Sequence, residues 1–338
     1  MKTNKALLIL LSLLAGMSCQ KAYEITPPKF EVSAGNTVYK VGEPVVFNIK
    51  SDADIVLFYS GEFGNDYNYK DVDRYTPASM RISFDLKQTI SGDAQTLNPE
   101  VLPISYSTDY NGEYTEESLD SAQWTDLTSR FTFPAPGYRV PVKNGSITTS
   151  NKSIDINDCF NEGKPIYLRF DYKVKKYDGT DKVGRTTVQF SNFLIQGHTE
   201  FDDILIHSIK DLQWGFVKRA SWTGANDRSS LPGAQEMLTM NCEWNPSQDR
   251  ELVAIAGPIS KAEDVNSGME ASVPIKELSD PDITTYSHTY TKPGVYDVVF
   301  VAINTNVYGK KNVVKHIPVT IHEDKGKIID PEEGDWDE

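Results

Sequence analysis

The stretch Val295-Tyr-Asp-Val-Val-Phe-Val-Ala-Ile-Asn304 decides the fold, and it follows the turn Thr291-Lys-Pro-Gly294. Proline followed by glycine suits a type II turn leading into a strand. Successive side chains of a strand point to opposite faces. One face then carries Tyr296, Val298, Phe300 and Ala302, and the other carries Val299, Val301 and Ile303. Since both faces are apolar, we expect a buried strand whose second face is covered by a neighbouring domain.

The rest of the chain repeats this β-type pattern. Its 17 tyrosines and 14 phenylalanines fall, with many Val, Ile and Thr residues, into short runs broken by Gly, Asn, Asp and Pro. The segments Ser118–Trp124 and Ser260–Asn266 are each long enough for a helical turn at most. The sequence therefore predicts an all-β fold built from packed sheets.

Two segments that stand far apart in the chain resemble the two ends of one domain type. Lys40–Phe47 is similar to the start of a PKD-type Ig-like domain, and Tyr286–Ala302 is similar to its end. An insertion into a surface loop costs little, because closure entropy grows only with the logarithm of loop length. We therefore expect an Ig-like β-sandwich of residues 29–74 plus 259–322, interrupted by residues 75–258. The alternative is two separate partial sandwiches.

The insert is also rich in alternating segments. In Lys164–Lys173, the side chains of Ile166, Leu168, Phe170 and Tyr172 would share one face of a strand. Ser107–Gly112 and Trp124–Leu127, together with this strand, resemble jelly-roll modules of secreted bacterial surface proteins. That resemblance implies a jelly-roll-like β-sandwich, related in fold to carbohydrate-binding domains.

The N-terminus has the parts of an export signal. The lysines of Met1–Lys5 precede the apolar run Ala6–Gly16, which is too short to span a bilayer, and small residues precede Cys19. Residues 1–19 thus read as a lipoprotein signal peptide with Cys19 as the lipid-attachment site, followed by a tether at 20–28. The alternative is an ordinary signal peptide in which Cys19 is incidental.

Taken whole, the mature chain resembles a family of Bacteroidetes surface lipoproteins from glycan-uptake loci of the starch-utilisation type. The most specific matching segments are Ala53–Glu62, Tyr106–Gly112 and Tyr290–Gly294. The resemblance implies a lipid-anchored protein of the outer membrane, located at the cell surface. Its expected partners are a polysaccharide or oligosaccharide and outer-membrane uptake proteins. The expected function is non-catalytic glycan binding; the alternative is a protein–protein assembly or adhesion module.

Charge and motifs exclude several other functions. A net charge of -14 argues against nucleic acid as a partner and against the protein body lying on anionic lipid, so the lipid anchor is the expected membrane contact. The sequence contains neither GxSxG nor HExxH, and its five histidines are scattered. We therefore expect no enzymatic activity.

Sugar binding requires exposed aromatic rings with amide and charged groups beside them. The polar segment Trp222–Gly233 resembles a surface loop, and a second aromatic segment lies at Asn65–Tyr69. The candidate ligand-binding residues are Trp214, Trp222, Asn226, Asp227, Arg228, Trp244, Tyr67 and Tyr69. The alternative is that the tryptophans belong to the core of a sandwich.

Two further features concern structural stabilisation. The alternating oxygen ligands Asp109, Asn111 and Glu113 suit a structural calcium ion, or else a turn stabilised by its own side chains. Cys159 and Cys242 allow one disulfide in an exported chain, or else two buried thiols. We expect no other cofactor. The acidic tail at 323–338 has no apolar periodicity and is predicted to be disordered.

Overall fold

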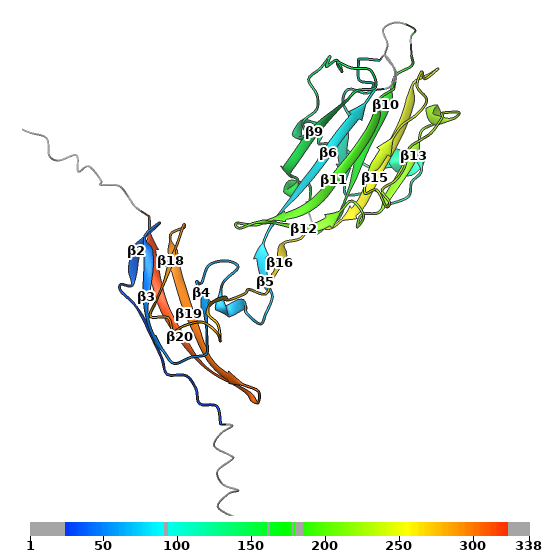
Figure 1. The fold of residues 1–338 in the computed structure, drawn as a ribbon. Helices are drawn as coiled ribbons and strands as arrows, with labels where there is room; N and C mark the ends of the chain where they lie inside the picture. Colours follow the sequence, from blue (N-terminus) through cyan, green and yellow to red (C-terminus); the bar gives the residue numbers. More distant parts are fainter. Residues whose placement is uncertain (1–23, 91–93, 161–162, 178, 180–184, 324–338) are drawn as a thin grey trace, which may run out of the picture. The chain divides into compact units, whose positions relative to one another are not determined.

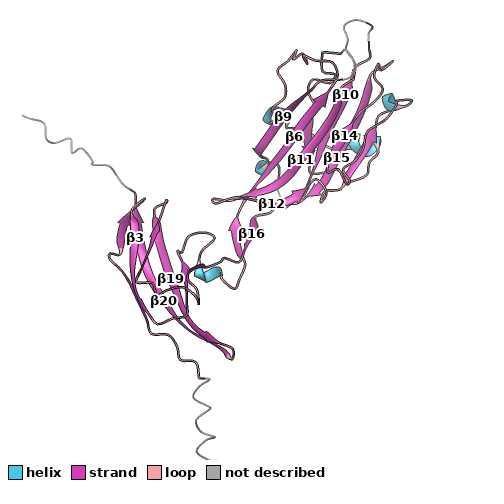
Figure 2. Ribbon diagram, in the orientation of Figure 1, coloured by secondary structure: helices cyan, strands magenta, loops and turns pink. Residues whose placement is uncertain are grey.

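The computed structural model describes residues 24–90, 94–160, 163–177, 179 and 185–323. These residues are almost entirely β-strands and connecting loops, which confirms the all-β prediction (Figures 1 and 2). They form two compact units. The first combines residues up to Arg74 with those from Gly268 onward, and the second is Tyr75–Ser267. The predicted signal peptide, the start of the tether and nearly all of the acidic tail lie outside the described residues.

The first unit contains a three-stranded and a five-stranded sheet. Strands from before and after the second unit pair directly in both sheets, β3 with β18 and β4 with β19. In sheet order, the strands are β1 (Phe30–Ala34), β3 (Pro44–Ser51) and β18 (Thr285–Thr289), then β17 (Val273–Lys276), β4 (Ile55–Tyr59), β19 (Gly294–Asn306), β20 (Gly309–His322) and β2 (Val38–Lys40). Residues distant in sequence therefore build one Ig-like sandwich.

Aromatic rings from both sheets form the core of this unit. Phe300 of β19 is fully buried and lies edge-on to Phe47 at 5.1 Å and to Phe58 at 5.2 Å between ring centroids. On β3 the side chains of Val45, Phe47 and Ile49 are buried while their neighbours are more exposed. The alternation in the sequence therefore becomes a packed interface between the sheets.

The opposite face of β19 is covered from within the same unit, so the expected cover by a neighbouring domain is wrong. Val299 and Val301 pack in a cluster with Tyr59 of β4. Tyr67, from the short 3₁₀ helix η2 (Tyr67–Tyr69), joins this cluster with its ring 5.2 Å from that of Tyr59. The segment after β4 thus folds back over its own sheet and shields the second apolar face.

The second unit is a sandwich of two larger sheets, with a short two-stranded sheet beside them. One sheet has the order β13 (Trp214–Lys218), β15 (Arg250–Ile259), β10 (Ile166–Val174), β7 (Ile104–Ser107) and β8 (Thr125–Asp126). The other has the order β12 (Asp203–Ser208), β11 (Thr187–His198), β6 (Ser79–Thr89) and β9 (Ser146–Asp155), with β14 (Leu238–Met240) also paired to β11. The small sheet pairs β5 (Arg74–Pro77) with β16 (Asp264–Gly268).

The predicted inward face of β10 is correct, because Ile166, Leu168, Phe170 and Tyr172 are all buried in the core of the second unit. The unit ends at Ser267 rather than at the predicted Pro258. Strand β15 continues to Ile259 and pairs with the central strand β10, and the following residues lead into β16. Main-chain pairing therefore keeps these residues with the second unit.

Helices are short throughout the described residues. They are α2 (Glu116–Ser121), η2, η3 (Thr128–Arg130), η4 (Asn157–Cys159) and η6 (Ala220–Trp222). The hydroxyl of Thr115 caps α2 by accepting a hydrogen bond from the Ser118 amide. No helix in the described part of the chain has the length and apolar character needed to cross a bilayer.

Candidate functional site

Most of the candidate residues of the second unit lie on two adjoining segments. The loop after η6 runs beside the segment that follows β14, since the Arg228 amide donates to the Asn241 carbonyl at 3.1 Å. The Asn226 amide donates to Oε2 of Glu243 at 3.2 Å. We call Asn226, Asp227, Arg228, Glu243 and Trp244 the loop surface.

The loop surface presents an accessible aromatic ring. Trp244 is 45% exposed, and Asn226 and Arg228 are also exposed. An indole ring can stack on the apolar C–H face of a sugar, while amide and guanidinium groups donate hydrogen bonds to its hydroxyls. These groups come from two segments held together by main-chain hydrogen bonds. The loop surface therefore has the chemical groups that glycan binding requires.

A buried arginine fixes the base of this surface. Arg250 of β15 contacts Oε1 of Glu243 through Nε at 2.6 Å and Nη2 at 2.5 Å. Its Nη1 donates to the carbonyls of Ser221 at 2.7 Å and Thr223 at 2.8 Å. One side chain thus joins the sheet to both loop segments. Such fixing lowers the entropy cost of ordering the loops when a ligand binds.

The carboxylate of Asp227 is already engaged within the protein. Burial raises its pKa, but hydrogen bonds from Lys218 and Ser229 outweigh this effect and hold the pKa below its ordinary value. Lys218 Nζ lies 2.9 Å from Asp227 Oδ2, and the Ser229 amide donates to Oδ1 at 2.9 Å. Asp227 therefore stays ionised and shapes the loop.

Two of the three candidate tryptophans belong to the core, so their predicted ligand contact is wrong. Trp222 is only 4% exposed, and its ring lies 6.1 Å from that of Tyr172. Trp214 alternates with Gly215 on β13 and turns inward, where its Nε1 donates to the Ile209 carbonyl at 2.9 Å. Trp214 also packs within 5.4 Å of Phe193. The alternative interpretation, that they are core residues, is correct for both.

The candidates Tyr67 and Tyr69 lie in the first unit and are used in its packing. Tyr67 covers the outer face of β19, as described above. The ring of Tyr69 lies 4.6 Å from the guanidinium of Arg74, whose Nη1 is 2.8 Å from Oε1 of the buried Glu270. These contacts anchor η2 to the strand that leads into the second unit. The structure therefore does not assign these tyrosines to the loop surface.

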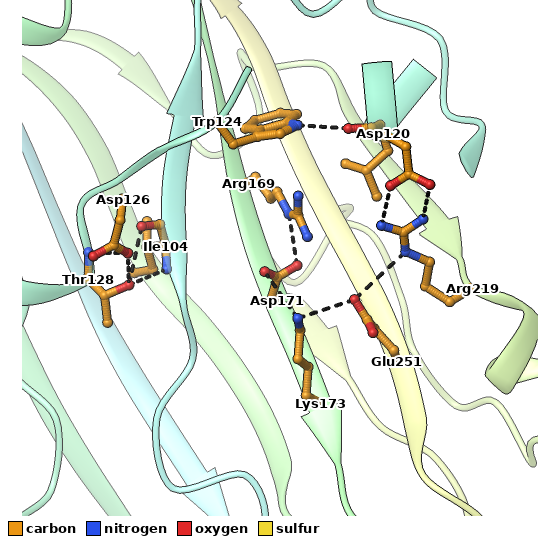
Figure 3. Close-up of polar contacts among 11 residues, drawn as sticks. Ile104, Asp120, Trp124, Asp126, Thr128, Arg169, Asp171, Lys173, Arg219 and Glu251 are labelled. Atoms are coloured by element: carbon orange, nitrogen blue, oxygen red, sulfur yellow. Dashed lines mark hydrogen bonds and ion pairs between the residues drawn. The ribbon is translucent and has the colours of Figure 1, made fainter. Parts of the chain in front are cut away.

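Charged side chains of alternating sign form a strip on the outer face of β10 and β15 (Figure 3). This strip was not predicted from the sequence. It begins with Arg169, whose Nε donates to Asp171 Oδ1 at 2.9 Å. Lys173 lies 3.9 Å from Asp171 and 3.4 Å from Glu251. The sequence signal was the set of polar residues at alternate positions of β10, on the face opposite its buried residues. One further partner, Glu251, comes from β15, whose position beside β10 was not predictable from either segment alone.

The strip continues to α2 through Arg219. Its guanidinium forms two hydrogen bonds with the Asp120 carboxylate, at 2.8 and 2.6 Å, and lies 3.7 Å from Glu251 (Figure 3). The bond from Arg219 also holds the pKa of Asp120 below its usual value. At the other end, the Arg169 guanidinium lies 5.5 Å from the ring of Trp124. The charges of the strip are paired with opposite charges within the protein. We therefore infer that the strip has a structural role and stabilises the α2 segment on the sheet.

The possible calcium ligands instead stabilise a turn. Asp109 Oδ1 accepts hydrogen bonds from Ser107 Oγ at 2.7 Å and the Gln123 amide at 2.9 Å, and these bonds lower its pKa. The Glu113 amide donates to Asn111 Oδ1 at 3.0 Å. Within the residues that the structure describes, no group of three or more His, Cys, Asp or Glu side chains is placed to hold a metal ion. These hydrogen bonds are those of a turn stabilised by its own side chains, the second of the two alternatives.

The predicted disulfide is wrong, because Cys159 and Cys242 are both free and buried. Cys159 ends η4, and Cys242 follows β14. Their sulfur atoms approach different groups, Asp158 Oδ1 at 3.9 Å and the Glu243 carbonyl at 3.6 Å. The large core of the second unit therefore incorporates both thiols without a covalent link, as the second alternative proposed.

We expect these thiols to react only when the protein unfolds. Burial raises the pKa of Cys159 to about 12 and that of Cys242 to about 11. At pH 8 the reactive thiolate is then a very small fraction of each, and the surrounding core also blocks access. A Cys19→Ser chain treated with Ellman's reagent should react slowly when native and release two equivalents of chromophore in guanidinium. Rapid native release would contradict the buried placement of these thiols.

A polar hollow of about 340 Å³ lies on the outer face of β6, β9 and β11. Its lining includes Asp85, Asn192 and Gln196. Asn192 Nδ2 donates to Asp85 at 2.7 Å, and bonds from Ser150 and Asn192 lower the pKa of this carboxyl. The only ring in the lining belongs to Phe84, which is buried in the core. The hollow therefore lacks the accessible aromatic platform that Trp244 supplies.

Residues 18–214 match the model of a protein family described as a domain of unknown function, DUF5017. No curated protein matches the chain. The matched segment ends at Trp214, so the loop surface lies beyond it. The match therefore provides no functional role for the loop surface, which has to be interpreted from its own geometry.

Proposed function

Because the chain belongs to the DUF5017 family, whose description assigns no activity, we propose a function from the geometry of the loop surface. The protein is a non-catalytic surface lipoprotein that binds polysaccharide or oligosaccharide as an accessory of an outer-membrane uptake system. It is anchored in the outer membrane through acylated Cys19 and faces the cell exterior. The observation that carries this proposal is the exposed Trp244, on a segment that is hydrogen-bonded to the loop of the exposed residues Asn226 and Arg228.

The loop surface suits recognition of neutral sugar hydroxyls better than chemistry on them. Glycoside hydrolysis requires a carboxylic acid and a carboxylate that both face the scissile bond. Here Asp227 is bonded to Lys218, and Glu243 is bonded to Arg250. Both carboxylates are thus committed to holding the loops. Asn226 and Arg228 supply donors, and Trp244 supplies an apolar ring, which supports binding without catalysis.

We predict that Trp244→Ala abolishes retardation of the protein in native gels containing its glycan. Loss of the stacking ring should weaken binding at least about tenfold, since rings dominate such contacts. The measurement is affinity electrophoresis of the mature chain against soluble α-glucans, β-glucans, mannans, xylans and pectins. Tyr75→Ala serves as the matched control, because Tyr75 is 61% exposed in the same unit but lies outside the loop surface.

Two results would count against this assignment. Retardation that survives Trp244→Ala would place the glycan elsewhere on the protein. If no glycan retards the unmodified chain, while it pulls down a stable protein complex from solubilised outer membranes, the assembly or adhesion function would replace glycan binding.

A further inference from the structure

The hairpin of β19 and β20 ends in two exposed apolar residues. Asn306 pairs with Gly309, and the two residues between them are Val307, which is 91% exposed, and Tyr308, which is 66% exposed. Two-residue hairpin turns usually take Gly, Asn or Asp, because these residues tolerate the turn backbone and interact well with water. A valine and a tyrosine at this position instead present apolar surface at the far end of the longest hairpin in the described chain.

Two exposed lysines follow the apolar pair after Gly309. They are Lys310 and Lys311, at the start of β20. The acidic residues at this end of the unit include the exposed Glu24, next to Ile25, and Asp54, whose Oδ2 accepts a hydrogen bond from the Thr305 amide at 2.8 Å. We call Val307, Tyr308, Lys310 and Lys311 the hairpin tip. In a chain of net charge -14, it is a locally basic and apolar feature.

This composition matches the interfacial zone of a lipid bilayer. Tyrosine rings sit at the level of the headgroups, with the hydroxyl in water and the ring toward the acyl chains. Lysines extend their alkyl stems along apolar surface and keep the ammonium group among the headgroups. A valine side chain gains free energy when it leaves water. At the hairpin tip, the apolar pair lies at the very end of the hairpin and the lysines lie further from the end. This order fits a tip that enters the bilayer end-on, with the lysines remaining among the headgroups.

The described chain begins at the same end of the first unit. Asn304 Nδ2 donates to the Thr26 carbonyl at 3.2 Å, and the side chain of Ile25 lies beside Gly309. Figure 1 shows this start and the hairpin tip at one end of the unit, and the end of β20 at the other. Cys19 precedes Ile25 by six residues, which span at most about 20 Å when fully extended. An acyl chain on Cys19 would thus hold a bilayer within reach of the hairpin tip.

We propose that the hairpin tip inserts into the bilayer that carries the Cys19 anchor and thereby orients the first unit with the end of its long hairpin on the membrane. This inference rests on the acylation proposed above. The surface within reach of a short tether is the anchoring bilayer itself, so we assign the hairpin tip to lipid rather than to a second copy of the chain.

The test uses an artificial anchor, so that it does not depend on acylation in the cell. A Cys19→Ser chain starting at residue 19 carries a hexahistidine tag before that residue and binds phosphatidylcholine vesicles that contain a nickel-chelating lipid. Tyr308→Cys is labelled with the environment-sensitive dye NBD, which the buried Cys159 and Cys242 do not take up. Val295→Cys is the matched control, because Val295 is 77% exposed on the same strand β19 but lies at its opposite end.

We expect NBD at position 308 to shift its emission to the blue and to gain severalfold in intensity on vesicle binding, with no change at position 295. Quenching by lipids that carry nitroxides on the acyl chains should follow the same pattern. A water-like spectrum at position 308 on bound protein would overturn the inference, as would an equal shift at both positions. A blue shift at 308 in free, concentrated protein would assign the hairpin tip to a second copy and overturn it too. Failure of acylation is measured separately, by detergent partitioning of the cell-made chain.

Discussion

A Phe300→Ala chain should lose about 3–5 kcal/mol of the free energy of unfolding of the first unit, which is a large part of the stability of a typical domain. Phe300 is fully buried on the central strand β19 and touches the rings of Phe47 and Phe58 from the facing and neighbouring strands. Removing its ring leaves a cavity that the surrounding strands cannot close, because they are fixed by pairing on both sides of β19. The cost is therefore expected near the upper part of the range for core truncations.

Calorimetry provides the measurement, because the two units have separate buried cores and should unfold in separate transitions. For a domain of about 100 residues, the expected loss lowers the midpoint of the affected transition by about 15–30 °C. The transition of the second unit should remain in place. Val295→Ala, an exposed position on the same strand, should move neither transition appreciably. If both transitions moved together, the units would unfold as one cooperative body.

Strand faces were predictable from sequence where the alternation was long. On β3 and β10, apolar residues recur at every second position, and the buried faces are those that the period of two gives. Short polar segments were not predictable in this way. Ser260–Asn266, expected to hold at most a helical turn, leads instead into β16. Its conformation is set by pairing with β5, a segment distant in sequence, and no local pattern reports that partner.

The sequence indicated which residue types the candidate site contains, but it did not indicate which of these side chains are buried. Trp214, Trp222 and Trp244 have similar polar surroundings in the sequence, yet only Trp244 is substantially exposed. Trp214 shares the apolar alternation of β13 with Phe216, which is a local signal for an inward ring. For Trp222 no such signal exists, because it turns inward through η6, whose position depends on contacts with β15. The role of Arg250 was hidden for the same reason, since its partners come from segments that meet only in the folded chain.

Arg250→Met should destabilise the second unit by about 3 kcal/mol and weaken glycan binding as well, although Arg250 is buried below the loop surface. The substitution removes the cation that Glu243 faces and the donor of the Thr223 carbonyl, while the Ser221 carbonyl keeps a hydrogen bond from Gln248 Nε2 at 2.9 Å. The half-buried carboxylate of Glu243 then loses its counter-ion and the Thr223 carbonyl loses its donor, and each lost partner costs free energy. Since these bonds join η6 to the segment before Trp244, the two halves of the loop surface should move apart.

The exposed pair of Arg130 and Asp158 is the matched control. Arg130 also forms two bonds with a carboxylate, at 2.6 and 2.7 Å, but its side chain is 33% exposed and that of Asp158 is 66% exposed, against 5% for the side chain of Arg250. Arg130→Met should therefore cost no more than about 1 kcal/mol. Urea unfolding measures both variants, and hydrogen exchange of residues 222–244 reports the loosening directly. Equal costs for the two arginines would contradict the assignment of Arg250 as a positioning residue.

Arg250→Lys separates geometry from charge in this prediction. A lysine keeps the cation for Glu243, but its single ammonium group cannot match the planar fork that reaches Glu243 and both carbonyls together. We expect it to restore part of the stability while exchange in 222–244 stays faster than in the unmodified chain. Glycan affinity should fall as hydrogen exchange in the loop becomes faster, even where the free energy of unfolding is partly restored. The reason is that the ligand contacts Trp244 and Asn226 together, so its binding depends on the spacing between them. The contrary result is a lysine variant that binds glycan as tightly as the unmodified chain although its amides in 222–244 exchange faster. That result would show that the Arg250 guanidinium does not shape the binding surface.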